Sequence, residues 1–289
     1  MILVTGSTGH FGKATIDFLL KKIPSSGIAA LARDRNKAVD LAAKGIDIRT
    51  GDYTDFNSMV KAFTGIEKLL LISSNDMNDR GGQHVNAINA AQKAGVKHIV
   101  YTSADIKDPL QSAIAFITDG HDKAENQIKN SGMTYTILKN NLYAECIPMF
   151  LGEKLPGTGV FFPAGPGKTP FAARIDMAEA AAHVLTTEGH GNKEYSISSG
   201  TSYSFSDVAD ILSEISGRKI AYLDPPKEVF TEQLIKAGVP EMVVGFTAAF
   251  AEAIKRDEFN LPGTTLESLL GRKPISLKAF LQTVYSTKK

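Results

Sequence analysis

The chain has 289 residues, of which 43% are hydrophobic and 22% charged, and its formal net charge is +1 at pH 7. This composition is typical of a soluble globular protein with one large or two unequal domains, and so small a charge gives no long-range attraction to nucleic acid or to an acidic membrane surface. The single cysteine, Cys146, excludes an intramolecular disulfide and suits a cytoplasmic location, and we find no membrane-spanning run, signal-peptide pattern or metal-ligand spacing.

The first twelve residues organise the expected fold. An apolar run at 2–4 predicts a buried parallel strand, three glycines follow at a spacing of three, and a helical pattern begins near Ala14. A strand, a glycine turn and a helix N-terminus can hold the pyrophosphate of a dinucleotide, whereas the alternative is a glycine-rich turn without a ligand. The turn residues that we expect to bind the cofactor are Gly6, Thr8, Gly9, His10, Phe11 and Gly12.

Strands and helices alternate through the first half of the chain. The predicted strands are 2–4, 28–32, 46–49, 68–72, 98–102 and 134–138, and the predicted helices are 14–22, 33–44, 56–63, 82–94 and 121–130. This alternation predicts an α/β fold with a doubly wound parallel sheet, the Rossmann type of dinucleotide-binding domain. Right-handed crossovers then place the carboxyl ends of all strands at one edge of the sheet, where ligands bind.

The alternation ends after about residue 150. Glycines and prolines between Pro156 and Pro170 predict a long loop, Asp176 is expected to cap an Ala-rich helix to about residue 186, and 195–198 is a candidate returning strand. A helix capped by Ser204 or Ser206, a short strand at 219–223 and further helices follow. We therefore expect a dinucleotide-binding domain at 1–150, with returning elements around 172–200, and a smaller α/β substrate-side subdomain over most of 151–289.

Arg33 decides which dinucleotide we expect. In NAD enzymes an acidic residue at the end of the second strand binds the adenosine 2′-hydroxyl, but here that strand is followed by Arg33 and Asp34. A guanidinium makes a planar, paired contact with a 2′-phosphate, which favours NADPH. NADH is the alternative because Asp34 follows directly, although Asp34 could instead cap the next helix. Lys37 either adds charge to this site or lies on a solvated helix face.

Polar residues follow two further strands at the predicted ligand edge. Asp52 and Tyr53 follow the third strand, where Asp52 can accept a hydrogen bond from the adenine amine and Tyr53 can pack on the ring edge. Ser73 and Ser74 follow the fourth strand. We expect these two serines to line the path to the ribose and nicotinamide.

Several segments together resemble the NmrA-like type of atypical short-chain dehydrogenase/reductase. They are residues 5–12, 70–74, 83–91, 94–103 and 135–140, and the similarity continues at 173–176 and 189–195. The whole chain is similar to the branch of bacterial NADPH-dependent quinone oxidoreductases and triphenylmethane reductases. The resemblance implies NADPH, a two-domain fold and hydride transfer to a quinone or another conjugated electrophile. Lys139 stands where we expect an arginine in this branch, so we leave its role open.

The catalytic tyrosine and lysine of most short-chain dehydrogenases, four residues apart on a helix, are missing from the expected place. Tyr135 and Lys139 have this spacing, but they lie along a predicted strand, where side chains do not follow helical spacing. In the helix that should carry the pair, His121 takes the place of the tyrosine and Glu125 that of the lysine. His121 is therefore our candidate catalytic residue, and the alternative is a surface histidine that pairs with Glu125.

The missing pair favours direct hydride transfer from NADPH to a quinone-like acceptor. Conjugation already activates a quinone carbonyl, so the transfer needs proximity and orientation more than a strong acid, and protons can come from water or a nearby side chain. The resemblance places Asn140 at the nicotinamide end of the cofactor and Tyr143 near the acceptor. Phe150, with Phe161, Phe162 and Phe171, either walls an apolar acceptor pocket or belongs to the core.

Two classes of function fit these features. The first is an NADPH-dependent reductase acting on a small quinone-like or dye-like molecule, and the second is a redox-sensing regulator that binds NAD(P) and a protein partner, for which residues 246–254 would be a docking surface. We favour the reductase because the resemblance is to a reductase branch, and the missing pair disfavours a nucleotide-sugar epimerase or dehydratase. Scattered basic residues predict no nucleic-acid partner, and the sequence leaves the oligomeric state open, with a homo-oligomer among the alternatives.

Overall fold

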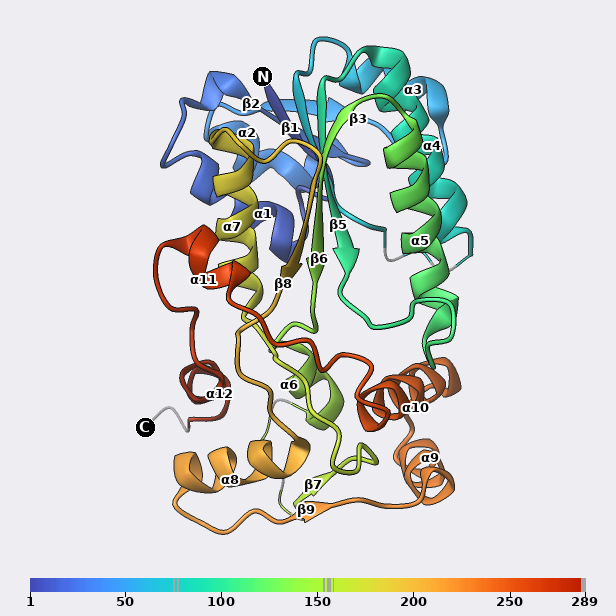
Figure 1. The fold of residues 1–289 in the computed structure, drawn as a ribbon, viewed down its shortest axis with the longest axis vertical. Helices are drawn as coiled ribbons and strands as arrows, with labels where there is room; N and C mark the ends of the chain where they lie inside the picture. The colour runs from blue at the N-terminus through green and yellow to red at the C-terminus, as the bar shows by residue number, and fades with distance from the viewer. Residues whose placement is uncertain (75, 77, 153, 155–156, 158, 287–289) are drawn as a thin grey trace.

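A seven-stranded, all-parallel sheet forms the upper part of the protein in a computed structural model that describes all residues except 75, 77, 153, 155, 156, 158 and 287–289. The strand order is β3-β2-β1-β4-β5-β6-β8 (Figure 1). The strands are β1 (Ile2–Val4), β2 (Ile28–Ala32), β3 (Asp47–Thr50), β4 (Lys68–Leu71), β5 (His98–Ala104), β6 (Thr134–Asn140) and β8 (Lys193–Ile197). The predicted doubly wound parallel sheet is confirmed.

Helices cover both faces of this sheet, because its strand residues are apolar on both sides. One face packs against α1 (His10–Leu19), α2 (Val39–Ala43), α7 (Arg174–Thr186) and α11 (Thr265–Leu270). The other packs against α3 (Phe56–Phe63), α4 (Arg80–Ala94) and α5 (Ala115–Asn130). Alternate residues of β5 separate the two layers, since Val100 faces the first set of helices and Tyr101 the second.

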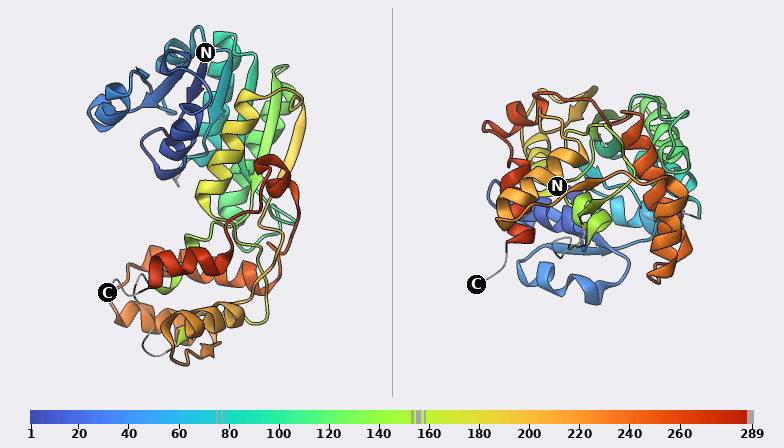
Figure 2. Two further views of the ribbon diagram at one scale, coloured as in Figure 1. Left: turned by 90° about the vertical axis from the view of Figure 1, so that its left-hand side faces the viewer. Right: turned by 90° about the horizontal axis from the view of Figure 1, so that it is seen from below.

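The remaining elements form a second, lower lobe around a core rich in phenylalanine. They are α6 (Cys146–Leu151), β7 (Val160–Phe161), α8 (Phe205–Ser216), β9 (Tyr222–Leu223), α9 (Lys227–Lys236), α10 (Glu241–Lys255) and α12 (Leu277–Tyr285). The ring of Phe162 contacts those of Phe150, Phe205 and Phe230, with centroids 4.3 to 5.8 Å apart. In side view the molecule curves into a C with one lobe at each end (Figure 2).

Most element boundaries lie within two residues of their predicted places, but three predicted helices differ. The helix predicted at 14–22 runs from His10 to Leu19, so it begins directly after Gly9. The helix predicted at 121–130 begins at Ala115, so His121 lies inside α5 rather than in its first turn. The segment predicted as one helix at 33–44 is split into a 3-10 helix, Arg35–Ala38, and α2. Residues 156 and 158 of the loop predicted at 156–170 lie outside the described residues.

Asp176 does not cap α7, and that prediction is wrong. The helix begins at Arg174, and Asp176 is a wholly buried residue of its first turn. Its Oδ1 accepts from Arg272 Nη2 at 2.7 Å, and its Oδ2 accepts from the Ile275 N–H at 2.6 Å. The carboxylate therefore anchors the segment between α11 and α12 to the sheet layer, because a buried charge needs hydrogen-bonding partners.

The Arg272→Ala variant should lower the free energy of unfolding by about 2–3 kcal/mol, because it leaves the buried Asp176 carboxylate poorly paired. The matched control is Lys278→Ala, which breaks an exposed ion pair with Glu214 and should cost less than about 1 kcal/mol. Urea unfolding at pH 7 measures both variants. Equal losses in the two would contradict an anchoring role for Asp176.

Candidate functional site

The glycine turn has the geometry that its sequence predicts. Gly6 has a φ of 56°, a conformation that favours glycine, and its carbonyl accepts from the Gly9 N–H at 3.0 Å. A Cβ on Gly12 would lie 2.4 Å from that same carbonyl oxygen, so only glycine fits there. The first intrahelical bond of α1 runs from Lys13 N to Gly9 O, which leaves the N–H groups of the first helical turn after Gly9 free to bind an anion.

An aromatic and cationic group stands beside this turn. The ring centroids of Phe11, on α1, and Tyr143 lie 6.3 Å apart. The guanidinium carbon of Arg174 lies over the Tyr143 ring, 4.8 Å from its centroid. Asn140, the last residue of β6, donates to the Tyr143 hydroxyl at 3.3 Å. Arg174 was not among the predicted site residues, because nothing in the sequence indicates that the N-terminus of α7 returns to the glycine turn.

Arg33 is exposed directly after the end of β2. The hydrogen bond from the Thr54 N–H is the main cause that lowers the pKa of Asp52, and the charge of Arg33 lowers it further. The pKa of Asp76 is lowered mainly by the Asn78 N–H and also by the charge of Arg33. Asp34 accepts from the Asn36 N–H, as expected of a cap, so it is engaged by its own turn. A guanidinium near carboxylates can bind a phosphate group by exchanging partners. Lys37 is also exposed, on the 3-10 helix.

Asp52 and Tyr53 are held by protein partners. Asp52 Oδ1 accepts from both the N–H and the hydroxyl of Thr54, at 2.9 and 2.7 Å. The Tyr53 hydroxyl lies 2.5 Å from Thr5 Oγ1 and 2.8 Å from Ile72 O, and burial raises the pKa of that hydroxyl. These bonds fix both residues at the sheet edge, close to the glycine turn.

The two serines after β4 connect the sheet edge to α4. The Ser73 N–H donates to Thr102 Oγ1 at 3.0 Å, and the Ser74 hydroxyl donates to Gln83 at 3.0 Å. The Ser74 N–H donates to His84 Nε2 at 2.8 Å. This last bond links the predicted cofactor path to a buried polar cluster.

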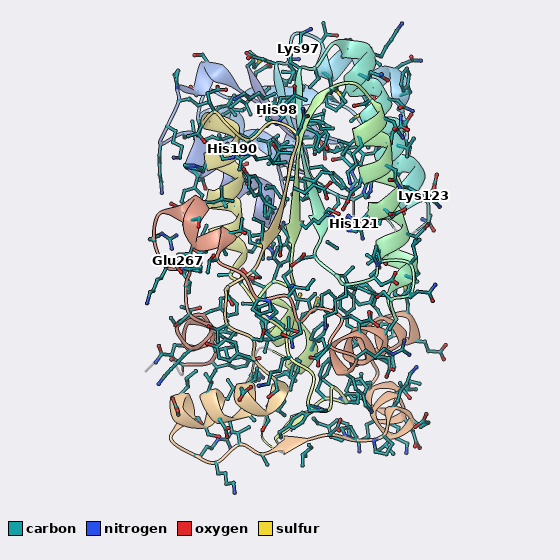
Figure 3. The ribbon with its side chains drawn as sticks, in the orientation of Figure 1. Lys97, His98, His121, Lys123, His190 and Glu267 are labelled. Carbon is teal, nitrogen blue, oxygen red and sulfur yellow. The ribbon has the colours of Figure 1, made fainter. Side chains whose placement is uncertain are left out.

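That polar cluster consists of Arg80, His84, Tyr101 and His121, and it lies where α4 and α5 meet β5. Tyr101 Oη lies 3.1 Å from His84 Nδ1 and 2.9 Å from His121 Nδ1, and His121 Nε2 lies 2.8 Å from Arg80 Nη2. Figure 3 shows His121 between α5 and the sheet. Glycines let the two helices approach, since a Cβ on Gly120 would lie 3.3 Å from the nitrogen of Gly81.

Burial controls the protonation of this cluster. It raises the pKa of the Tyr101 hydroxyl well above its usual value and lowers the pKa of Arg80. Burial, aided by the charge of Arg80, lowers the pKa of His84 to about 4 and that of His121 well below its usual value. Both histidine rings are therefore neutral near pH 7.

His121 does not pair with Glu125, so the surface alternative for this histidine is wrong: the ring is only 6% exposed. Glu125 instead accepts from the Ser103 hydroxyl at 2.5 Å and pairs with Lys139 at 3.3 Å. Lys139 also pairs with Glu194 at 2.7 Å. Ser103, His121, Glu125 and Lys139 line part of a pocket of about 290 Å³ at the carboxyl ends of β5 and β6.

The phenylalanines expected near the acceptor pack into the lower lobe. Phe150 is 9% exposed and stacks on Phe162 with centroids 5.1 Å apart, and Phe162 and Phe171 are fully buried. This packing favours the core alternative for Phe162 and Phe171. None of the described lining residues of the 290 Å³ pocket is a phenylalanine.

Comparison with known proteins gives one family and consistent neighbours. The NmrA-like family model matches residues 1–281. The chain is 36% identical over 278 residues to quinone oxidoreductase 2 of Escherichia coli, covering 96% of each chain, and 29% identical over 246 residues to an NAD(P)H azoreductase of Xenophilus azovorans, covering 83% and 82%. It resembles the structure of a Citrobacter sp. triphenylmethane reductase complexed with NADP(H), with 37% identity, coverage of 98% and 100%, and a TM-score of 0.92.

Proposed function

The chain belongs to the NmrA-like family, and from that premise we propose that it is an NADPH-dependent reductase that transfers hydride to a quinone or a similar conjugated electrophile. The observation that carries this proposal is similarity over nearly the whole chain to relatives described as quinone, azo and triphenylmethane reductases. Structures of two such relatives contain NADP(H) or NADPH. A cytoplasmic location and a small-molecule acceptor belong to the same proposal.

The residues present fit the cofactor. The crowding at Gly12 and the free N–H groups of α1 form a cradle for a pyrophosphate. We assign the exposed guanidinium of Arg33 to the 2′-phosphate, and Arg174, which lies over the Tyr143 ring, adds positive charge beside the turn. When bound, NADPH supplies the hydride. Ser73, Ser74 and Asn140, at the ends of β4 and β6, are the residues that we assign to orienting the nicotinamide end.

The described residues provide no tyrosine and lysine pair on α5. Tyr135 and Lys139 lie on β6, and Lys139 is engaged by two carboxylates. An acceptor that needs no strong acid suits this site, because conjugation lowers the barrier and the protein contributes proximity and orientation. We assign contact with the acceptor to His121, which lines the pocket. Tyr143 and Phe150 stay predicted acceptor contacts, but neither is among the lining residues of this pocket.

The regulator alternative is less well supported. Its expected docking surface at residues 246–254 lies on α10, where Phe250, Ala251, Ala253 and Ile254 are buried in the core of the lower lobe. The named relatives above are reductases. Both observations favour turnover over partner binding at this helix.

Purified protein should oxidise NADPH in the presence of a simple quinone or a triphenylmethane dye, because the site combines a dinucleotide cradle with a polar pocket at the sheet edge. Loss of the reduced cofactor's absorbance measures the rate over a panel of acceptors. The control is NADPH without an acceptor, which should remain stable. Tight NADPH binding with no turnover of any acceptor would favour the regulator instead.

A further inference from the structure

The hydrogen bonds of the polar cluster run in one direction. The Ser74 N–H can only donate, so His84 Nε2 accepts and the neutral ring carries its proton on Nδ1. That proton faces Tyr101 Oη at 3.1 Å, with Gly120 O further away at 3.4 Å. Tyr101 can then donate its own proton to His121 Nδ1 at 2.9 Å. His121 is left with its proton on Nε2.

The proton on His121 Nε2, at the end of this series of hydrogen bonds, faces another donor, the guanidinium of Arg80. His121 Nε2 lies 2.8 Å from Arg80 Nη2, and a guanidinium has no acceptor atom. In the other tautomer of His121, Nε2 accepts from Arg80, but Tyr101 Oη then receives two N–H groups and its own proton has no acceptor among the described residues. Either arrangement lacks one hydrogen-bond acceptor, which is costly in a buried site.

Arg80 also lacks a hydrogen-bond acceptor among the described residues. Its Nε is buried and has no hydrogen-bond partner within the described part of the chain. His121 also lines the 290 Å³ pocket, so the polar cluster borders a space that an acceptor can enter. Glu125 lines the same pocket, but Ser103 and Lys139 engage its carboxylate. One oxygen placed at Arg80 and His121 would satisfy donors that the protein leaves without partners.

We propose that Arg80 and His121 form an oxyanion site, in which the reducible oxygen of the acceptor accepts hydrogen bonds from the guanidinium and from the imidazole Nε2–H. The proposal rests on the reductase function and defines its acceptor class as quinones, whose reduction places negative charge on an oxygen. Breaking of the cofactor's C–H bond delivers hydride to a ring carbon of the quinone, where a new C–H bond forms and the displaced electron pair collects on this oxygen as an enolate. Water protonates the oxygen, and loss of the ring C–H proton to water with uptake of a proton by the second oxygen completes the hydroquinone. Donors already aimed at the developing charge stabilise the transition state.

The neutral state of His121 suits this role. A neutral imidazole is not a general acid, but its N–H can still donate a hydrogen bond to an oxyanion. Arg80 provides the positive charge. Tyr101 and His84 do not touch the acceptor. They are positioning residues that keep the His121 proton on Nε2 through a chain that begins at Ser74, on the predicted cofactor path.

The first test compares Arg80→Met with the control Lys123→Met. Lys123 is exposed on α5 and pairs with Asp119, outside the polar cluster. Arg80→Met should lower kcat/KM for a quinone by about 100-fold with little change in the Kd for NADPH, whereas Lys123→Met should leave both unchanged. Arg80→Gln, which keeps a polar side chain, serves if the methionine variant is unstable. Wild-type quinone turnover in folded Arg80 variants would overturn the proposal.

Two acceptors separate the oxyanion site from general damage. A cationic triphenylmethane dye becomes neutral on hydride addition and forms no oxyanion, so Arg80→Met should lower its reduction far less than that of a quinone. Equal losses with quinone and dye would contradict the proposal. Tyr101→Phe, which removes the hydroxyl that orients His121, should lower kcat for quinone by about 10-fold while KM stays near its wild-type value. A change in KM alone would contradict a positioning role.

Binding of 4-nitrophenol to the protein with NADP⁺ gives a readout independent of turnover. An oxyanion site binds the coloured phenolate in preference to the phenol, so the pKa of the bound probe should fall, and Arg80→Met should abolish that fall. An unshifted probe pKa in the wild type would overturn the oxyanion site even if quinones are reduced. If the wild type reduces no acceptor but shifts the probe, the reductase function fails while the oxygen-binding site stands.

Discussion

Gly12→Ala should reduce NADPH affinity by at least about 100-fold, the largest effect that we expect of any single methyl group in this protein. The added Cβ would lie 2.4 Å from Gly6 O and 2.8 Å from Ser7 Cα, both backbone atoms that no side-chain rotation can move aside. Relief requires α1 to shift away from β1. Such a shift displaces the N–H groups that form the phosphate cradle.

Fluorescence titration with NADPH measures this affinity, and circular dichroism shows whether the variant is folded. The matched control is Gly27→Ala in the same domain, where a Cβ would meet only Ile23 Cδ1 at an ordinary 3.7 Å. We expect its affinity to remain within about twofold of the wild type. Unchanged NADPH binding by a folded Gly12→Ala variant would show that the turn is not the phosphate site.

Arg33→Gln should raise the KM for NADPH by about 10- to 100-fold and leave the KM for NADH nearly unchanged, because a charged hydrogen bond to the 2′-phosphate is lost. Arg33 is exposed, and its charge affects the pKa of Asp52 and Asp76, so it faces the side of the sheet edge where we place the adenosine. The expected signature is a change in the ratio of the two KM values.

Arg35→Gln is the control for charge alone. Arg35 is two residues away, but its Nη1 donates to Ile48 O at 3.0 Å, so its guanidinium is committed to the fold. We expect the ratio of the KM values for NADPH and NADH to stay constant in this variant. A loss of NADPH preference in both variants would assign selectivity to the general positive charge of this surface.

The local signals in the sequence predict the sheet and the cofactor cradle well. β2 matches its predicted range, and Ser204 caps α8 with a capping box. Such features depend on apolar runs, glycines and caps, which act within a few residues. Asp176 shows the limit of these signals, since its partners lie about a hundred residues away in sequence.

The polar cluster shows the same limit at the candidate site. The sequence pointed to His121 from its place in a helix pattern, but gave no reason to join it to Tyr101 on β5 or Arg80 on α4. These residues meet because α4 and α5, from two successive crossovers, pack side by side over the β5 face of the sheet, and because Gly81 and Gly120 let the helices approach.

The described structure contains no helix long and apolar enough to cross a membrane.

The position of α7 and β8 has a consequence for synthesis of the protein on the ribosome. The chain leaves the sheet after β6, builds part of the lower lobe, and only then supplies α7, which packs on α1, and β8, which pairs with β6. Until about residue 200 has emerged, Ile16, Leu19 and Val100 lack their covering helix. A fragment that ends at residue 150 should therefore expose this apolar face and aggregate, and nascent chains of that length are expected substrates for chaperones.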